Sequence, residues 1–306
     1  MIGIVKKSTG SSYELWDENY NVLNASLKGK FKMDGIKSTN PIAVGDKVSY
    51  TWDEQHQIAI IDQLFSRKNY IIRKSNNLSK QTHIIASNID LMVIVATITS
   101  PRTSQGFIDR LLVTAEAYGI DPLIVFNKKD ILDADDEVIL QRNINMYAGI
   151  PYPTIIVSAL NGEGMAMLKE LLQHKITLFT GHSGAGKSTL INKLNPELNI
   201  KSNSISTYSD KGKHTTTFAE MYKINKDTFL IDTPGIKEFG IVDISKEELG
   251  QYFPEINALR NACKFNNCLH INEPGCAVIS ALNNKLINSN RYHSYMSILK
   301  NEDTHH

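Results

Sequence analysis

The chain has 306 residues, a length that suits two domains of usual size or three small ones. Hydrophobic residues make up 42% and charged residues 21%, which is the composition of a globular protein and excludes a disordered or fibrous one. Lysine and arginine number 33 against 32 aspartate and glutamate residues, so a protein coated in positive charge is excluded, whereas a local basic patch is not.

The hydrophobic and cysteine patterns indicate the compartment. The best apolar run, residues 91–97, has the length of one strand and is too short to cross a bilayer, so we expect no membrane association. The N-terminus has no basic segment followed by an apolar one, so we expect no signal peptide. All three cysteines lie between positions 263 and 276 and are too few for a disulfide framework, which favours the reducing cytoplasm.

The first 65 residues alternate short apolar stretches with turn clusters, which predicts four or five strands. Stretches of this kind cover residues 2–5, 12–15, 47–51 and 58–61. A small closed barrel fits them, because an open sheet of this size would leave long unpaired edges. Residues 66–86 are predicted to be a linker, whose first part, up to Lys80, is basic and has no acidic residue.

Between residues 87 and 242 the pattern changes to alternating strands and helices, typical of a mostly parallel sheet with helices on both faces. The predicted strands cover residues 91–97, 123–127, 154–158, 176–180 and 228–232. The predicted helices cover residues 107–118, 137–147, 165–173 and 187–194. Residues 243–306 are short, polar and rich in asparagine, and their predicted core is too small to stand alone.

A phosphate-binding loop follows the strand at 176–180 and opens the next helix, the context that the motif G-x-x-x-x-G-K-[ST] requires. The loop consists of Gly181, His182, Ser183, Gly184, Ala185, Gly186, Lys187 and Ser188, with Thr189 next in the chain. Its backbone amides can donate hydrogen bonds to phosphates, which also lie at the positive end of the helix dipole. We expect Lys187 to reach the β and γ phosphates and Ser188 to bind Mg²⁺. The alternative, a glycine-rich turn before a helix, is disfavoured by the complete context.

Two further motifs select the base. The residues Asn127, Lys128, Lys129 and Asp130 fit the N-K-x-D pattern of GTPases. A carboxylate accepts from two donors on guanine, and adenine offers no such pair, so the wrong base leaves a buried charge unpaired. Asn127 can tie the base edge to the loop, and the stem of Lys128 can cover the ring. Ser158 and Ala159, followed by leucine, resemble the loop that contacts guanine O6. NKKD alone is a weak signal, typical also of a solvated loop, and the phosphate loop strengthens it.

Other residues fit the magnesium ion and the γ-phosphate. Asp232 follows the strand at 228–232 and can hold Mg²⁺ through water, while the amide of Gly235 can sense the γ-phosphate. Three threonines, Thr215 to Thr217, lie where the first switch of a GTPase belongs. One of them, for which we take Thr216, is expected to complete the Mg²⁺ shell in the GTP state, although the sequence does not choose among the three.

Three thiols and one imidazole lie within 14 residues near the C-terminus. These four residues are Cys263, Cys268, His270 and Cys276. A closed tetrahedral Zn²⁺ site needs four such ligands, and a site without an open position is structural. Bound zinc would also supply the folding energy that a small core lacks. The alternative is three unrelated buried cysteines, which their crowding disfavours.

The base motifs precede the phosphate loop, which is a circular permutation of the usual GTPase order, and residues 174–175 would join the original ends. The permuted order, the preceding barrel and the following Cys/His cluster resemble the RsgA (YjeQ) family of small-ribosomal-subunit biogenesis GTPases. The resemblance spans essentially the whole chain, including GHSGAGKST, GKHTTT and DTPGIKEFG. It implies an OB-fold barrel over residues 1–65, a permuted α/β P-loop GTPase domain over 87–242 and a zinc-binding domain over 243–306.

The same resemblance implies a function. It implies hydrolysis of GTP to GDP and phosphate with Mg²⁺, and a role in late maturation of the 30S subunit. We also expect the 30S subunit to stimulate this hydrolysis. OB-folds commonly present a strand face to nucleic acid, so we expect the barrel and the basic stretch to contact 16S rRNA, with a solvated linker as the alternative. We expect the chain to act as a monomer in the cytoplasm.

Catalysis departs from the Ras-like pattern. Ile236 directly follows DTPG, where many GTPases carry a glutamine that orients the attacking water, so unstimulated hydrolysis is expected to be slow. His214 is the best candidate for that role, and a surface histidine beside Lys213 is the alternative.

Two other functions stay open. A phosphate-loop kinase or ATPase is disfavoured by the base motifs, and an RNA-binding factor with a structural nucleotide site is disfavoured by intact Lys187 and Asp232.

Overall fold

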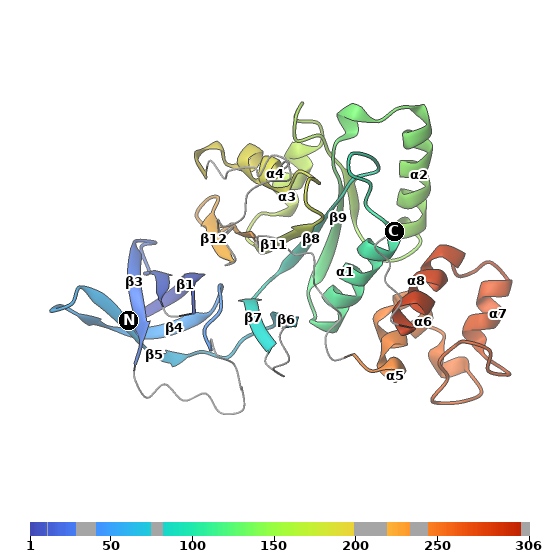
Figure 1. Ribbon diagram of the computed structural model, residues 1–306, viewed down its shortest axis with the longest axis horizontal. Helices are drawn as coiled ribbons and strands as arrows, with labels where there is room; N and C mark the ends of the chain where they lie inside the picture. The colour runs from blue at the N-terminus through green and yellow to red at the C-terminus, as the bar shows by residue number, and fades with distance from the viewer. Residues whose placement is uncertain (11, 29–40, 75–81, 199–218, 233–243, 301–306) are drawn as a thin grey trace, which may run out of the picture.

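The computed structural model describes residues 1–10, 12–28, 41–74, 82–198, 219–232 and 244–300. Figure 1 shows three parts in chain order: a small barrel, a sheet flanked by helices, and a group of short helices at the C-terminal end. Within the described ranges, none of the helices is both long and apolar enough to cross a membrane.

The N-terminal part is a closed barrel of five strands. They are β1 (Ile2–Ser8), β2 (Tyr13–Trp16), β3 (Val22–Leu27), β4 (Lys47–Asp53) and β5 (Ile58–Leu64). Neighbours follow the order β1-β2-β3-β5-β4, and β4 pairs back onto β1, with Ile2 opposite Ser49. Val5, Leu15 and Ile61 fill the interior and are fully buried. This β1–β4 pairing closes the barrel and confirms the prediction. Closure leaves no long open edge, which is why a small sheet favours it.

The predicted linker contains ordered structure. Strands β6 (Tyr70–Lys74) and β7 (Thr82–Ser87) pair antiparallel within it. Arg67 is not a free basic residue, because its guanidinium binds the buried carboxylate of Asp46 through Nε and Nη2, each at 2.6 Å. Ser87 donates to the same carboxylate at 2.6 Å. The segment predicted as a basic linker over residues 66–86 therefore contains a strand pair and is anchored to the barrel through Asp46.

The central sheet has the order β10-β9-β8-β11-β13-β12. Five of its strands are parallel, namely β8 (Leu91–Ala96), β9 (Asp121–Phe126), β10 (Thr154–Ile156), β11 (Ile176–Gly181) and β13 (Phe229–Asp232), and β12 (Glu220–Lys223) is antiparallel. β1 of the barrel continues the sheet where Lys7 pairs with Glu220. Lys6 of the barrel adds an ion pair of 2.9 Å to the same glutamate.

Helices cover both faces of this sheet, as predicted. They are α1 (Gln105–Ala117), η1 (Lys129–Ile131), α2 (Ala134–Ala148), α3 (Met165–Leu171), α4 (Lys187–Leu194) and η2 (Pro196–Leu198). Alternate residues of β8 enter two cores: Met92 packs on the side of α1 and α2, and Val93 on the side of α3 and α4. The chain runs from β8 to β10 and then returns to β11 on the other side of β8. Ligands of such sheets bind at the carboxyl ends of the strands beside this switch point.

The C-terminal part is a group of short helices around one core. They are α5 (Lys246–Leu249), η3 (Gly250–Tyr252), α6 (Pro254–Asn257), η4 (Arg260–Ala262), α7 (Ala277–Asn283) and α8 (Ser289–Leu299). Its core includes Val113 of α1, so this part shares its core with the central domain. The fully buried Arg291 of α8 strengthens the junction, with Nη1 at 2.5 Å from Asp109 of α1 and Nε at 2.7 Å from Glu255.

Candidate nucleotide and metal sites

The phosphate loop begins at the end of β11 and leads into α4, and its shape requires glycine at two positions. Gly181 has φ 143°, and a Cβ atom there would lie 2.3 Å from the carbonyl oxygen of Val95. Gly186 has φ 94°, and a Cβ atom there would lie 2.3 Å from Nδ2 of Asn127. Side chains at either position would therefore displace the loop from β8 or from the NKKD segment.

Lys187 lies across this loop at the start of α4. Its Nζ donates to the carbonyls of Gly181 at 2.7 Å and His182 at 2.8 Å. Burial lowers the pKa of Lys187, and the negative charge of Asp232 opposes this shift. Asp232 ends β13 beside Phe179 of β11, so its carboxylate is close to the loop. Lys187 and Asp232, which were predicted to bind the phosphates and magnesium, therefore share one edge of the sheet.

Asn127 joins three motifs that are far apart in the chain. Its side chain is 3% exposed, and Nδ2 donates to the carbonyl of Ala185 in the phosphate loop at 2.9 Å. Its Oδ1 accepts from the amide of Ala159 at 3.1 Å. Three motifs therefore meet at the buried amide of Asn127: NKKD after β9, the Ser158–Ala159 loop after β10, and the phosphate loop after β11.

The other base-motif residues point in different directions. Asp130 is exposed and its carboxylate accepts a hydrogen bond from the hydroxyl of Ser158. Lys128 has φ 66°, and its Nζ donates to the carbonyl of Ser100. Lys129 instead forms an ion pair with Glu137 of α2, so its charge is used outside the base site.

The rest of the predicted nucleotide residues divide into two groups. Ser183, Gly184 and Thr189 are exposed and Ser188 is half-buried, all at the loop or the first turn of α4. His214, Thr216 and Gly235 lie outside the described residues, so their predicted roles stay predictions.

Sequence reasoning missed the contacts of the phosphate loop with the segment from the end of β8 to the first turn of α1. A Cβ atom at Gly184 would lie 3.3 Å from Cδ of Pro101, and the ring of His182 stacks on Phe107. This segment carries no known motif, and only the three-dimensional fold brings it against the phosphate loop. Ordinary apolar residues of α1 gave no signal of the contact.

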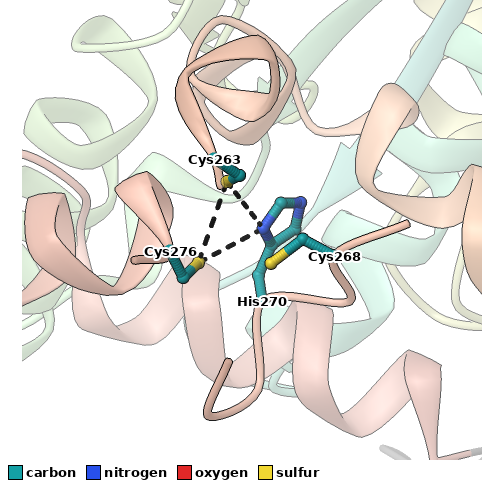
Figure 2. A group of neighbouring side chains, drawn as sticks. All are labelled: Cys263, Cys268, His270 and Cys276. Atoms are coloured by element: carbon teal, nitrogen blue, oxygen red, sulfur yellow. Dashed lines mark hydrogen bonds between the residues drawn. The ribbon is translucent and has the colours of Figure 1, made fainter. Parts of the chain in front are cut away.

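The four predicted metal ligands form one cluster (Figure 2), with all four ligand atoms within 4.8 Å of one another. Nδ1 of His270 lies 3.6 Å from Sγ of Cys263 and 3.4 Å from Sγ of Cys276, and those sulfurs are 4.0 Å apart. Metal–ligand bonds of about 2.3 Å for sulfur and 2.0–2.1 Å for nitrogen give tetrahedron edges of roughly 3.5–3.8 Å. The spacing therefore suits one tetrahedral ion.

The surrounding chain holds this cluster in place. Cys276 caps α7 by accepting from the amide of Ile279 at 3.4 Å. Tyr292 of α8 donates to the carbonyl of His270 at 2.6 Å, and Tyr295 donates to that of Leu269 at 2.8 Å. Burial raises the pKa of Cys268 to about 12 and lowers the pKa of His270, which favours the neutral imidazole. A bound cation would favour the thiolates that coordination requires.

Comparisons with known proteins cover the whole chain. The model of a family described as RsgA GTPase matches residues 64–242. A Flavobacterium psychrophilum protein named small ribosomal subunit biogenesis GTPase RsgA is 51% identical over 308 residues, with 99% of this chain and 94% of that protein covered. A Bacteroides fragilis (strain YCH46) protein of the same name is 48% identical, with 99% and 97% covered.

Two solved structures share the fold over nearly the full length. YjeQ from Thermotoga maritima superposes with a TM-score of 0.79 at 32% identity, with 98% of each chain covered. YloQ, described as a circularly permuted GTPase, gives a TM-score of 0.75 at 28% identity, with 98% of this chain and 94% of the other covered.

Proposed function

Because the chain belongs to the RsgA GTPase family and is therefore a hydrolase of GTP, we propose that it binds the 30S ribosomal subunit and assists its late maturation. The ribosomal part of the proposal rests on the names of the full-length relatives. The observation that carries its nucleotide part is the contact of Asn127 with both Ala185 and Ala159. It fixes the base motif to the phosphate loop, which is the geometry that a guanine nucleotide spanning both would need.

In this proposal, guanine is recognised at the ends of β9 and β10. The carboxylate of Asp130, which Ser158 already orients, accepts from the two donors on the base edge. We assign guanine O6 to the backbone amide of Ala159, whose N–H would then be shared with Oδ1 of Asn127, and the stem of Lys128 covers one ring face. Lys129, paired with Glu137, supports the segment rather than the base.

The phosphates bind at the loop from Gly181 to Ser188. Its amides and the positive end of α4 attract the anion, and Lys187 adds a formal charge. The hydroxyl of Ser188 and the carboxylate of Asp232 offer hard oxygen ligands for Mg²⁺ at the same edge, and the ion would neutralise charge on the β and γ phosphates. We assign Thr216 to the remaining protein ligand and the amide of Gly235 to sensing the γ-phosphate.

Hydrolysis depends on alignment of water. Ile236 offers no hydrogen bond at the position of the usual glutamine, so the free enzyme turns over slowly. We assign water positioning to His214, which docking on the 30S subunit brings toward the γ-phosphate. One such group is commonly worth about 10²–10⁴-fold in rate.

We also propose that the Cys/His cluster holds one structural Zn²⁺. Three thiolates and one imidazole favour zinc over hard cations such as Mg²⁺ or Ca²⁺, and their spacing fits its tetrahedral shell.

The barrel and the remaining basic residues after it contact 16S rRNA, although Arg67 is not among these contacts because Asp46 neutralises it. The protein acts as a monomer in the cytoplasm.

The test is GTP turnover at saturating nucleotide for the protein alone, with purified 30S subunits and with 50S subunits. We expect strong stimulation by 30S subunits only, and ADP is expected not to compete with GDP for binding. Equal rates in the three conditions would refute the role on the small subunit while leaving the GTPase assignment in place.

A further inference from the structure

Phe107 of α1 and His182 of the phosphate loop form a stacked pair of rings. Their centroids are 3.7 Å apart and their planes differ by 23°. Phe107 is 6% exposed and belongs to the core between α1 and the sheet, whereas His182 is followed by the exposed Ser183. The stack therefore connects a well-packed helix to an exposed loop.

The backbone of His182 holds other parts of the loop. Its carbonyl accepts from Nζ of Lys187 at 2.8 Å and from the amide of Ala185 at 3.2 Å. A rotation of residue 182 would move both partners, and these are the lysine and one of the amides assigned to the phosphates. Fixing the ring of His182 limits that rotation.

Helix α1 is itself held by α2 and by the C-terminal helices. Two residues after Phe107, the buried carboxylate of Asp109 accepts from Arg291 at 2.5 Å and from the hydroxyl of Tyr147 at 3.0 Å. Val113 of the same helix packs into the C-terminal core. Phe107 therefore projects from a helix that two other parts of the protein fix.

We propose that Phe107 is a positioning residue that, through its stack on His182, keeps the phosphate loop in the shape that binds the diphosphate of a guanine nucleotide. The inference rests on the proposed function, because it takes a guanine nucleotide as the ligand. Aromatic pairs contribute about 2- to 10-fold in an equilibrium constant beyond simple burial. The effect acts on the phosphates, since the residues assigned to the base follow β9 and β10 instead.

The test compares GDP with guanosine, which carries the base but no phosphate. Phe107→Leu keeps an apolar side chain in the core and removes the stack, so we expect the Kd for GDP to rise about 3- to 10-fold. The Kd for guanosine is expected to stay within twofold of the wild type. His182→Ala is expected to match Phe107→Leu, and His182→Phe, which restores a ring on Phe107, is expected to recover most of the GDP affinity that His182→Ala loses.

Phe229→Leu is the matched control, because Phe229 is 7% exposed in the same core but packs on Trp16 and Tyr20. It is expected to leave the GDP Kd unchanged. An unchanged GDP Kd in Phe107→Leu would overturn the inference, and so would an equal loss of GDP and guanosine or a His182→Phe variant as weak as His182→Ala. A wild-type protein that binds no GDP would instead refute the proposed function.

Discussion

Replacing Asp130 with asparagine is expected to weaken GTP binding by about 3–6 kcal/mol. The carboxylate loses two hydrogen bonds to the base, and each bond to a charged group is worth about 1.5–3 kcal/mol. At 1.4 kcal/mol per factor of ten, the Kd for GTP rises about 10²–10⁴-fold. Because the Asp130 side chain is exposed and its partner is a single serine hydroxyl, the substitution leaves the fold intact.

The same substitution is expected to favour xanthosine nucleotides. Xanthine carries an oxygen where guanine carries its exocyclic amine, and the amide of asparagine can donate to that oxygen. Titration of a fluorescent guanine or xanthine nucleotide measures both affinities. Ser158→Ala is the control, because it removes only the hydroxyl that orients Asp130, and it is expected to cost about 0.5–1.5 kcal/mol without changing base preference.

Unchanged GTP affinity in Asp130→Asn would refute the assignment of the base site. A loss of GTP binding without a gain for xanthosine triphosphate would show that the variant damages the pocket rather than altering recognition.

Three further predictions concern the metal, the domain junction and catalysis. Elemental analysis is expected to find about one zinc per chain, and Cys268→Ser is expected to unfold the C-terminal helices while GDP binding largely persists; a metal-free protein with a normal C-terminal fold would contradict this. Arg291→Met leaves Asp109 buried without its cation and is expected to lower the free energy of unfolding in urea by about 3–5 kcal/mol, whereas a change below about 1 kcal/mol would contradict the buried pair. His214→Ala is expected to reduce 30S-stimulated turnover about 10²–10⁴-fold with little effect on GDP affinity, and full stimulation would remove the histidine from the mechanism.

Strands buried on both faces were the most predictable elements. β8 is an uninterrupted apolar run because Met92 and Val93 enter different cores, and the sequence showed this directly. The nucleotide motifs were predictable for a similar reason, since each is local and follows such a strand. The metal cluster was predictable because its four ligands lie close in the chain.

Contacts between distant segments were not predictable in the same way. β3 was not among the strands located in advance, because most of its side chains are exposed or half-buried and show little alternation. The basic residues after the barrel suggested a solvated linker. Arg67 is nevertheless buried and forms an ion pair with Asp46, and no local sequence pattern reveals that pairing. The stack of Phe107 on His182 joins residues 75 positions apart, and the phosphate-loop motif that contains His182 gives no sign of Phe107.

The nucleotide site tolerates the permuted order because strand ends, not chain order, assemble it. Its three motifs follow β9, β10 and β11, and parallel strands bring their carboxyl ends to one edge of the sheet. The chain passes from α3 to β11 through a short join, where Lys175 donates to the carbonyl of Leu171 at 2.9 Å and the amide of His174 donates to Thr228 at 3.2 Å. This join precedes β11 and so lies at the opposite edge from the phosphate loop, where its geometry does not constrain Asn127 or Lys187. The permutation therefore relocates the chain ends, which frees one end of the GTPase domain to continue into the barrel and the other into the C-terminal helices.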